Sequence, residues 1–88
     1  MPRLFVANIS FSTKEADVLA AFSPFGTVES VEIITDRHSG VSHGFAYVEM
    51  TSREDAQRAI SKLHGAHFRG RTLIVDESRP KPVESAGG

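Results

Sequence analysis

The sequence predicts a single α+β domain with the element order strand, helix, strand, strand, helix, strand. Four short segments are rich in β-branched and aromatic residues, which is typical of strands. Two of the stretches between them carry apolar residues at helical spacing. The 88 residues, 40% of them hydrophobic, are enough for one packed core and too few for two domains. The chain has no cysteine, which excludes disulfides, thiolate metal sites and cysteine catalysis.

The first strand is expected over residues 4–9 (LFVANI), a short run of strand formers. Ser12 favours a helix start, because its hydroxyl can cap the amide three residues on while Glu15 reaches back. The apolar residues of this helix share one face: Val18, Leu19, Phe22 and Phe25. Pro24 should shorten the last turn, and Gly26 is expected to end the helix.

The second strand is expected over residues 28–35. Its alternation separates two pairs of side chains: Val31 with Ile33, and Glu32 with Ile34. Residues 36–40 (DRHSG) are polar and end in glycine, which predicts a hairpin loop.

The third strand is expected over residues 44–50 (GFAYVEM). One face carries Ala46, Val48 and Met50, and the other carries Phe45, Tyr47 and Glu49. Ser52 should cap the second helix, with Asp55 at the reciprocal position. The buried stripe of this helix is expected to be Ala56, Ala59, Ile60 and Leu63. Gly65 ends the helix, and residues 72–77 predict a fourth strand with Leu73 and Val75 inward.

This order predicts two βαβ-type halves joined by a hairpin, with both helices on one face of a four-stranded antiparallel sheet. The open sheet face should then be polar, yet alternation places Phe5, Phe45 and Tyr47 there. An aromatic cluster on a solvent-facing surface is typical of a binding site. Residues 1–79 are expected to form the domain and residues 80–88 a flexible tail.

Two alternatives bear on this aromatic face. A register slip of one residue would bury the rings, but it would expose the aliphatic side chains of both strands. Exposing those side chains is less favourable than exposing the rings. The proline-containing tail is also long enough to reach the rings and cover them.

Residues 4–9 resemble the hexapeptide of the RNA recognition motif family, and residues 43–50 (HGFAYVEM) resemble its octapeptide. The 36–40 loop and the helix end at 63–65 also fit, so the resemblance covers residues 3–79. It implies a ferredoxin-like fold with sheet order 4-1-3-2. It also implies that single-stranded RNA, or single-stranded DNA, lies across the sheet with its bases stacked on the aromatic rings.

Mapped by motif position, Phe5 and Tyr47 would be the stacking platforms, and Phe45 would lie between them against sugars. Asn8 would be a hydrogen-bonding group in a loop or at the strand end. The flanks that tune base choice would be Glu32, Ile34, Ile74 and Asp76. The phosphate partners would be Arg3, Arg37, Arg79 and Lys81, with Arg69 and Arg71 nearer an edge.

Two departures from the family pattern have different consequences. The octapeptide normally opens with Lys or Arg, but here it opens with His43, which is mostly uncharged at neutral pH, so the phosphate contact is weakened. It normally ends in an aromatic residue, but Met50 should face the core, where it affects packing only. With a net charge of −1, few cations are available to displace counterions. We therefore expect micromolar or weaker binding and a salt slope of about 1–3.

The sequence predicts a monomeric module that binds RNA without catalysis, cofactor or metal. His64 and His67 lack a third ligand, so a solvated pair is expected. A protein-binding module of the same fold is the main alternative, favoured by the acidic first turns of both helices. An acylphosphatase-type enzyme is disfavoured, because the segment after the first strand has neither arginine nor glycine. No segment predicts a membrane span or a secretory signal, which favours an intracellular, cytoplasmic protein. A free-standing small protein and a domain of a larger factor both remain open.

Overall fold

The computed structural model describes residues 2–35, 38–40 and 42–78, with only the backbone of residues 42 and 43. The main sheet contains β1 (Arg3–Ala7), β2 (Val28–Thr35), β3 (Ser42–Met50) and β6 (Ile74–Ser78). The helices are α1 (Glu15–Phe22), the 3₁₀ turn η1 (Ser23–Phe25) and α2 (Arg53–Leu63). A small hairpin joins β4 (His67–Phe68) to β5 (Arg71–Thr72). The predicted tail, 80–88, lies outside the described residues.

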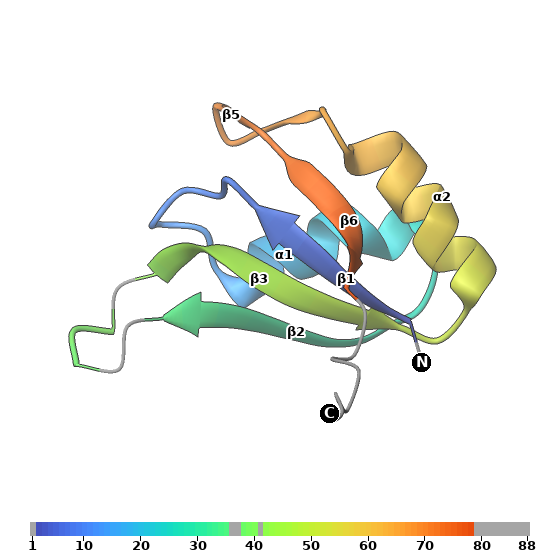
Figure 1. The fold of residues 1–88 in the computed structure, drawn as a ribbon, viewed down its shortest axis with the longest axis horizontal. Coiled ribbons are helices and arrows are strands. Elements are labelled where there is room, and N and C mark those ends of the chain that lie inside the picture. The colour runs from blue at the N-terminus through green and yellow to red at the C-terminus, as the bar shows by residue number, and fades with distance from the viewer. Residues whose placement is uncertain (1, 36–37, 41, 79–88) are drawn as a thin grey trace, which may run out of the picture.

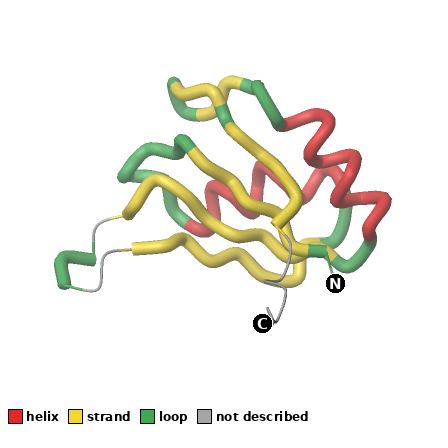
Figure 2. Tube along the Cα trace, viewed as in Figure 1, coloured by secondary structure: helices red, strands yellow, loops and turns green. Residues whose placement is uncertain are grey.

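The sheet is antiparallel throughout, with the strand order β2-β3-β1-β6. Because β6 is the fourth strand that the sequence predicts, the predicted order 4-1-3-2 is confirmed. Figures 1 and 2 show α1 passing behind the strands, α2 beside β6, and no helix in front of the sheet; residues of both helices belong to the core. The fold is therefore the ferredoxin-like α+β sandwich, with one sheet face covered and the other open.

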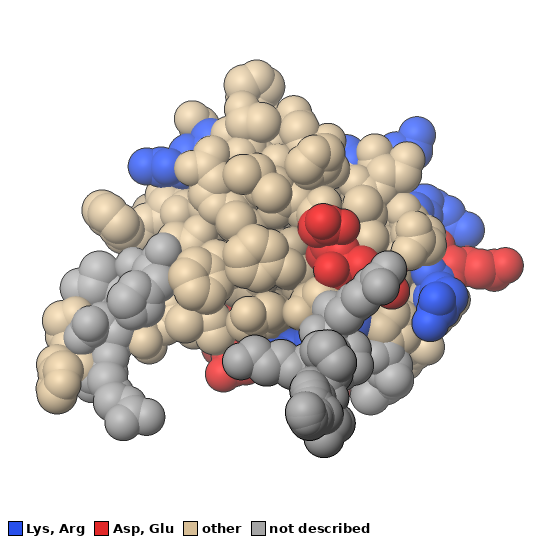
Figure 3. All heavy atoms as spheres, in the orientation of Figure 1, with Lys and Arg blue, Asp and Glu red and all other residues tan. Residues whose placement is uncertain are grey.

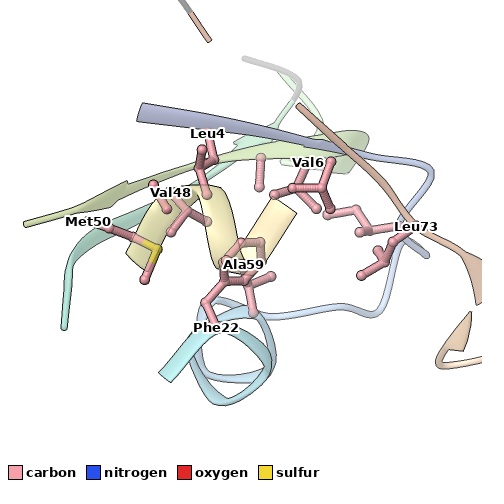
Figure 4. Close-up of a cluster of buried hydrophobic side chains, with 12 residues drawn as sticks. Leu4, Val6, Phe22, Val48, Met50, Ala59 and Leu73 are labelled. Atoms are coloured by element: carbon pink, nitrogen blue, oxygen red, sulfur yellow. The ribbon is translucent and has the colours of Figure 1, made fainter. Parts of the chain in front are cut away.

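The core lies between the sheet and the two helices, and Figure 4 shows its side chains filling that space. The inward residues of β1 and β3 are at most 1% exposed: Leu4, Val6, Ala46, Val48 and Met50. From the other side, Val18 and Phe22 of α1 and Ala56 and Ala59 of α2 close the core. Small alanines let α2 approach the sheet closely, and the burial of Met50 confirms that it is a packing residue.

The start of α1 differs from the prediction. The helix begins at Glu15, and the residue before it, Lys14, is the N-cap. The backbone N–H of Lys14 donates to Asp17 Oδ2 over 2.9 Å, so the carboxylate supplies the cap. The Ser12 hydroxyl lies instead 3.1 Å from the hydroxyl of Ser10. A carboxylate is the stronger acceptor, and it shifts the start of the helix by two residues.

Two other details differ. Leu19 is 43% exposed, because Val18 and Phe22 point toward the sheet and Leu19 is about 100° farther round this eight-residue helix. Ser52 caps α2 as predicted, accepting the Asp55 N–H over 3.3 Å, but the Asp55 carboxylate pairs with Arg58 at 3.2 Å.

The fourth strand is shorter at its start than predicted, because part of the expected segment forms the β4–β5 hairpin. The two residues between these strands, Arg69 and Gly70, both have positive φ, 51° and 83°. Two-residue hairpin turns of this kind match the natural strand twist. Leu73 and Val75 are 2% exposed, as predicted. No helix among the described residues is long and apolar enough to cross a membrane.

Candidate nucleic-acid interface

Three aromatic rings cluster on the open face of the two central strands. Phe5 of β1 is the register partner of Tyr47 of β3, and their ring centroids are 5.8 Å apart. Phe45 lies 5.6 Å from Phe5 and 6.5 Å from Tyr47. The rings therefore form a triangle in which Phe5 is nearest to both others, so the expectation that Phe45 lies between Phe5 and Tyr47 is wrong. All three residues are partly exposed.

Strand alternation and cross-strand pairing together produce this cluster. The neighbours of Phe5 along β1 are Leu4 and Val6, which are buried beneath the sheet, so Phe5 must point to the open side. Tyr47 lies in the same way between Ala46 and Val48. Because β1 and β3 are adjacent, directly opposed side chains lie within contact distance. The predicted exposure of the rings is confirmed.

Carboxylates flank the two paired rings in one row across the sheet. Glu32 of β2 is the register partner of Tyr47, and Asp76 of β6 is the register partner of Phe5. The row therefore reads acid, ring, ring, acid. Carboxylates repel phosphates and accept hydrogen bonds, so these two positions are suited to the N–H groups of base edges rather than to the nucleic-acid backbone.

Apolar side chains flank the third ring less regularly. Ile74 is 46% exposed and pairs with Ala7, the register partner of Phe45. Ile34 is partly buried and lies where the β2–β3 register shifts between Ile33 and Thr35. The irregularity gives Ile34 no direct register partner, which simple alternation does not predict.

Arg3 lies over one of the rings. Its guanidinium carbon is 4.2 Å from the Tyr47 ring centroid, and its Nη2 is 3.7 Å from Glu32 Oε1. This is a cation–π contact supported by an exposed ion pair. Arg3 was expected to pair with a phosphate; in the structure it covers a face of the predicted platform.

Asn8 turns the chain at the end of β1 and forms two hydrogen bonds within the protein. Its φ is 64°, a conformation that asparagine tolerates better than most residues. Its Nδ2 donates to the Thr72 carbonyl over 2.7 Å, and its Oδ1 accepts from Arg71 Nη1 over 2.8 Å. Sequence reasoning missed this link, although an asparagine directly after a strand is a known signal of such a turn.

Among the other predicted cations, Arg69 has an ion-pair partner on α1. Arg69 pairs with Asp17 at the start of α1, with 3.8 Å between their charged atoms. Arg37, Arg79, Lys81 and the His43 side chain lie outside the described part of the chain. Figure 3 accordingly shows a largely uncharged centre on the sheet face, with acidic atoms over β6 and basic atoms at the rim.

The arrangement offers stacking surfaces, hydrogen-bond acceptors and guanidinium groups. Within residues 2–35, 38–40 and 42–78, no three His, Cys, Asp or Glu side chains are grouped to hold a metal. His64 is more than a solvated residue, because its Nδ1 accepts the Val75 N–H over 3.1 Å and ties α2 to β6. The described face is therefore suited to binding a ligand by stacking on its aromatic rings and by hydrogen bonds to its carboxylates.

This fold and this ring-bearing face define the chain as a member of the RNA recognition motif family, whose model matches residues 4–74. The chain is 38% identical over 85 residues to RbpA of Synechocystis sp., covering 97% of this chain and 84% of RbpA. The solved RNA binding protein PG1 is 39% identical, with a TM-score of 0.89, covering 93% of this chain and 99% of that one. The Sxl-lethal protein/RNA complex is 33% identical, with a TM-score of 0.85, covering 89% of this chain and 47% of that one.

Proposed function

We propose that this chain binds single-stranded RNA on the open face of its sheet, stacking bases on Phe5 and Tyr47, and that it acts as a binding module without catalysis. Family membership and the likeness to a solved protein/RNA complex support the ligand class. The single observation that carries the proposal is the placement of the rings: they lie on adjacent central strands, opposite the core.

Energetics favour this use of the rings. A partly exposed ring cluster gains little for folding, because the core on the other sheet face is complete without it. Stacking a base on an exposed ring contributes roughly 1–3 kcal/mol and tolerates any base. The favourable free energy of two such stacks is partly offset by the entropy lost on association. The net binding free energy is consistent with a dissociation constant of about micromolar size.

The test is a fluorescence anisotropy titration of a short single-stranded RNA with wild type, Phe5→Ala and Tyr47→Ala. We expect each substitution to weaken binding by roughly 1–3 kcal/mol, which is fivefold or more. Phe11→Ala is the matched control: Phe11 is 75% exposed and lies between β1 and α1, where it borders a hollow with Ile33 and Thr35 and is not one of the three clustered rings. It should bind like wild type. Equal affinities for all four proteins would eliminate stacking on the sheet.

A protein-binding module is the second candidate, and the observation that favours it is the exposed side chain of Leu19. This residue lines a hollow between α1 and β2 together with Ala16 and Val31, and Glu15 and Glu29 are at its border. Leu19→Asp separates the two functions, because it alters the hollow and leaves the sheet face intact. RNA affinity lost with this variant, in a protein that still folds, would contradict the sheet-face proposal.

A further inference from the structure

The family octapeptide supplies a phosphate contact through its first residue, which is a histidine here, so another cation is needed if the RNA backbone is to be held. Among the described arginines, Arg3, Arg58 and Arg69 are within 4 Å of a carboxylate. Arg71 differs from them. Its described partner is the neutral amide of Asn8, so its charge is not compensated by that contact.

Arg71 is also held in a defined place. Its Nη1 donates to Asn8 Oδ1, and the same amide is anchored through Nδ2 to the Thr72 carbonyl. Asn8 directly follows Ala7, whose register partners are Phe45 and Ile74. The guanidinium therefore lies at the end of the sheet, one position beyond the row that contains the third ring.

This location is at the rim of the open face. Figure 3 shows basic atoms beside the β4–β5 hairpin, at the border of the uncharged area. Arg71 is exposed, and a guanidinium has five N–H donors, of which the bond to Asn8 uses one. The other donors are suited to a bidentate contact with phosphate oxygens, which is the geometry in which arginine exceeds lysine.

We propose that Arg71, oriented by Asn8, is a phosphate-binding site for the RNA backbone as it leaves the ring cluster. This inference rests on the proposed RNA-binding function, and it adds a contact with a phosphate group of the RNA. Asn8 acts as a positioning residue. It was expected to hydrogen-bond RNA itself, and we propose instead that it orients Arg71, which contacts the phosphate. The contact positions the strand and carries no base preference.

The test measures RNA affinity as a function of salt for wild type and Arg71→Gln, with oligomers of uridine, adenosine and cytidine. One lost phosphate contact on a single strand should lower the magnitude of the salt slope by about 0.7. We expect the affinity of Arg71→Gln to fall by about tenfold at low salt, by the same factor for all three oligomers. Arg53→Gln is the control, because it removes the same charge from the exposed first turn of α2.

Asn8→Gly tests the positioning role, since glycine keeps the positive φ and removes only the amide. It should weaken binding in the wild-type background and cause no further loss in Arg71→Gln, because the two residues act as a unit. A purely structural role would instead give losses of RNA affinity that add in the double variant. Arg71→Lys should retain the salt slope while losing part of the affinity.

The outcomes are separable. If wild type does not bind RNA, the proposed function fails and this inference fails with it. If wild type binds through Phe5 and Tyr47 but Arg71→Gln has the slope and affinity of Arg53→Gln, only the phosphate site is overturned. A loss confined to one oligomer would also overturn it, because that pattern indicates a base contact.

Discussion

At the scale of single residues, the most informative contact is that of Arg3 with Tyr47. The guanidinium covers a ring face that the family resemblance assigns to a base, and Glu32 holds it there. An incoming base must displace Arg3 or stack on its planar guanidinium. The Arg3–Glu32 ion pair is exposed, with side chains 44% and 66% accessible, so its contribution is at most about 1 kcal/mol.

Glu32→Gln is therefore expected to strengthen RNA binding by a few-fold. The substitution releases Arg3 and removes a negative charge beside the phosphate path, and a contribution of about 1 kcal/mol corresponds to about fivefold in affinity. The control is Glu29→Gln, which removes the same charge from β2 but borders the hollow facing α1. Anisotropy titration at low salt measures both. Weaker binding by Glu32→Gln would indicate that the carboxylate accepts a hydrogen bond from a base.

At the scale of elements, the contact between η1 and the start of α2 determines how closely the two helical segments approach. Gly26 has a φ of 155°, and a Cβ at this position would overlap the Asp55 side chain. Asp55 is held by Arg58, whose Nη1 also donates to the Phe25 carbonyl over 3.4 Å. The glycine is required both by its backbone conformation and by the packing against it.

Gly26→Ala is accordingly expected to destabilise the domain by about 1–3 kcal/mol, because the side chain is overpacked and the φ is unfavourable for alanine. The denaturant midpoint of unfolding measures this effect. Gly40→Ala is the comparison: its φ of 75° is also positive, but a Cβ there meets nothing within 4 Å. If both variants had the same midpoint, the packing part of this explanation would be incorrect.

At the scale of the whole molecule, charge balance limits how RNA can be held. Ten lysines and arginines and eleven acidic residues give a net charge of −1, and three described arginines are already paired with carboxylates. Long-range attraction of a polyanion is therefore small, and stacking must supply most of the binding free energy.

For wild type we expect the logarithm of the RNA association constant to fall with the logarithm of salt concentration with a slope of about −1 to −3. The measurement is a series of titrations between about 50 and 200 mM salt, a range over which strongly electrostatic binders lose several orders of magnitude. Phe5→Ala should weaken binding at every salt concentration and leave the slope unchanged, since the ring carries no charge. A slope magnitude of six or more would mean that phosphate contacts dominate.

The sequence by itself determined the order of the two helices and the four strands of the main sheet, the strand faces and the ring-bearing surface. These features are periodic and local: an alternating strand has one inward and one outward face wherever it packs. The placement of Phe5 and Tyr47 opposite Leu4 and Val48 followed from this periodicity alone. The start of α1, by contrast, depends on which of several local hydrogen-bond acceptors is strongest. The Asp17 carboxylate accepts the capping hydrogen bond, and the predicted Ser12 cap does not form.

Only the tertiary structure decided which of the predicted polar residues are free and which already have partners. Asn8 and Arg71 are separated by 63 positions, and Arg3 meets Glu32 from a strand two places away in the sheet. No local pattern encodes such pairings, because they arise when separate strands are brought into register. The physical reason is that side-chain direction is a property of each strand, whereas hydrogen-bond and ion-pair partners depend on the three-dimensional packing of all of them.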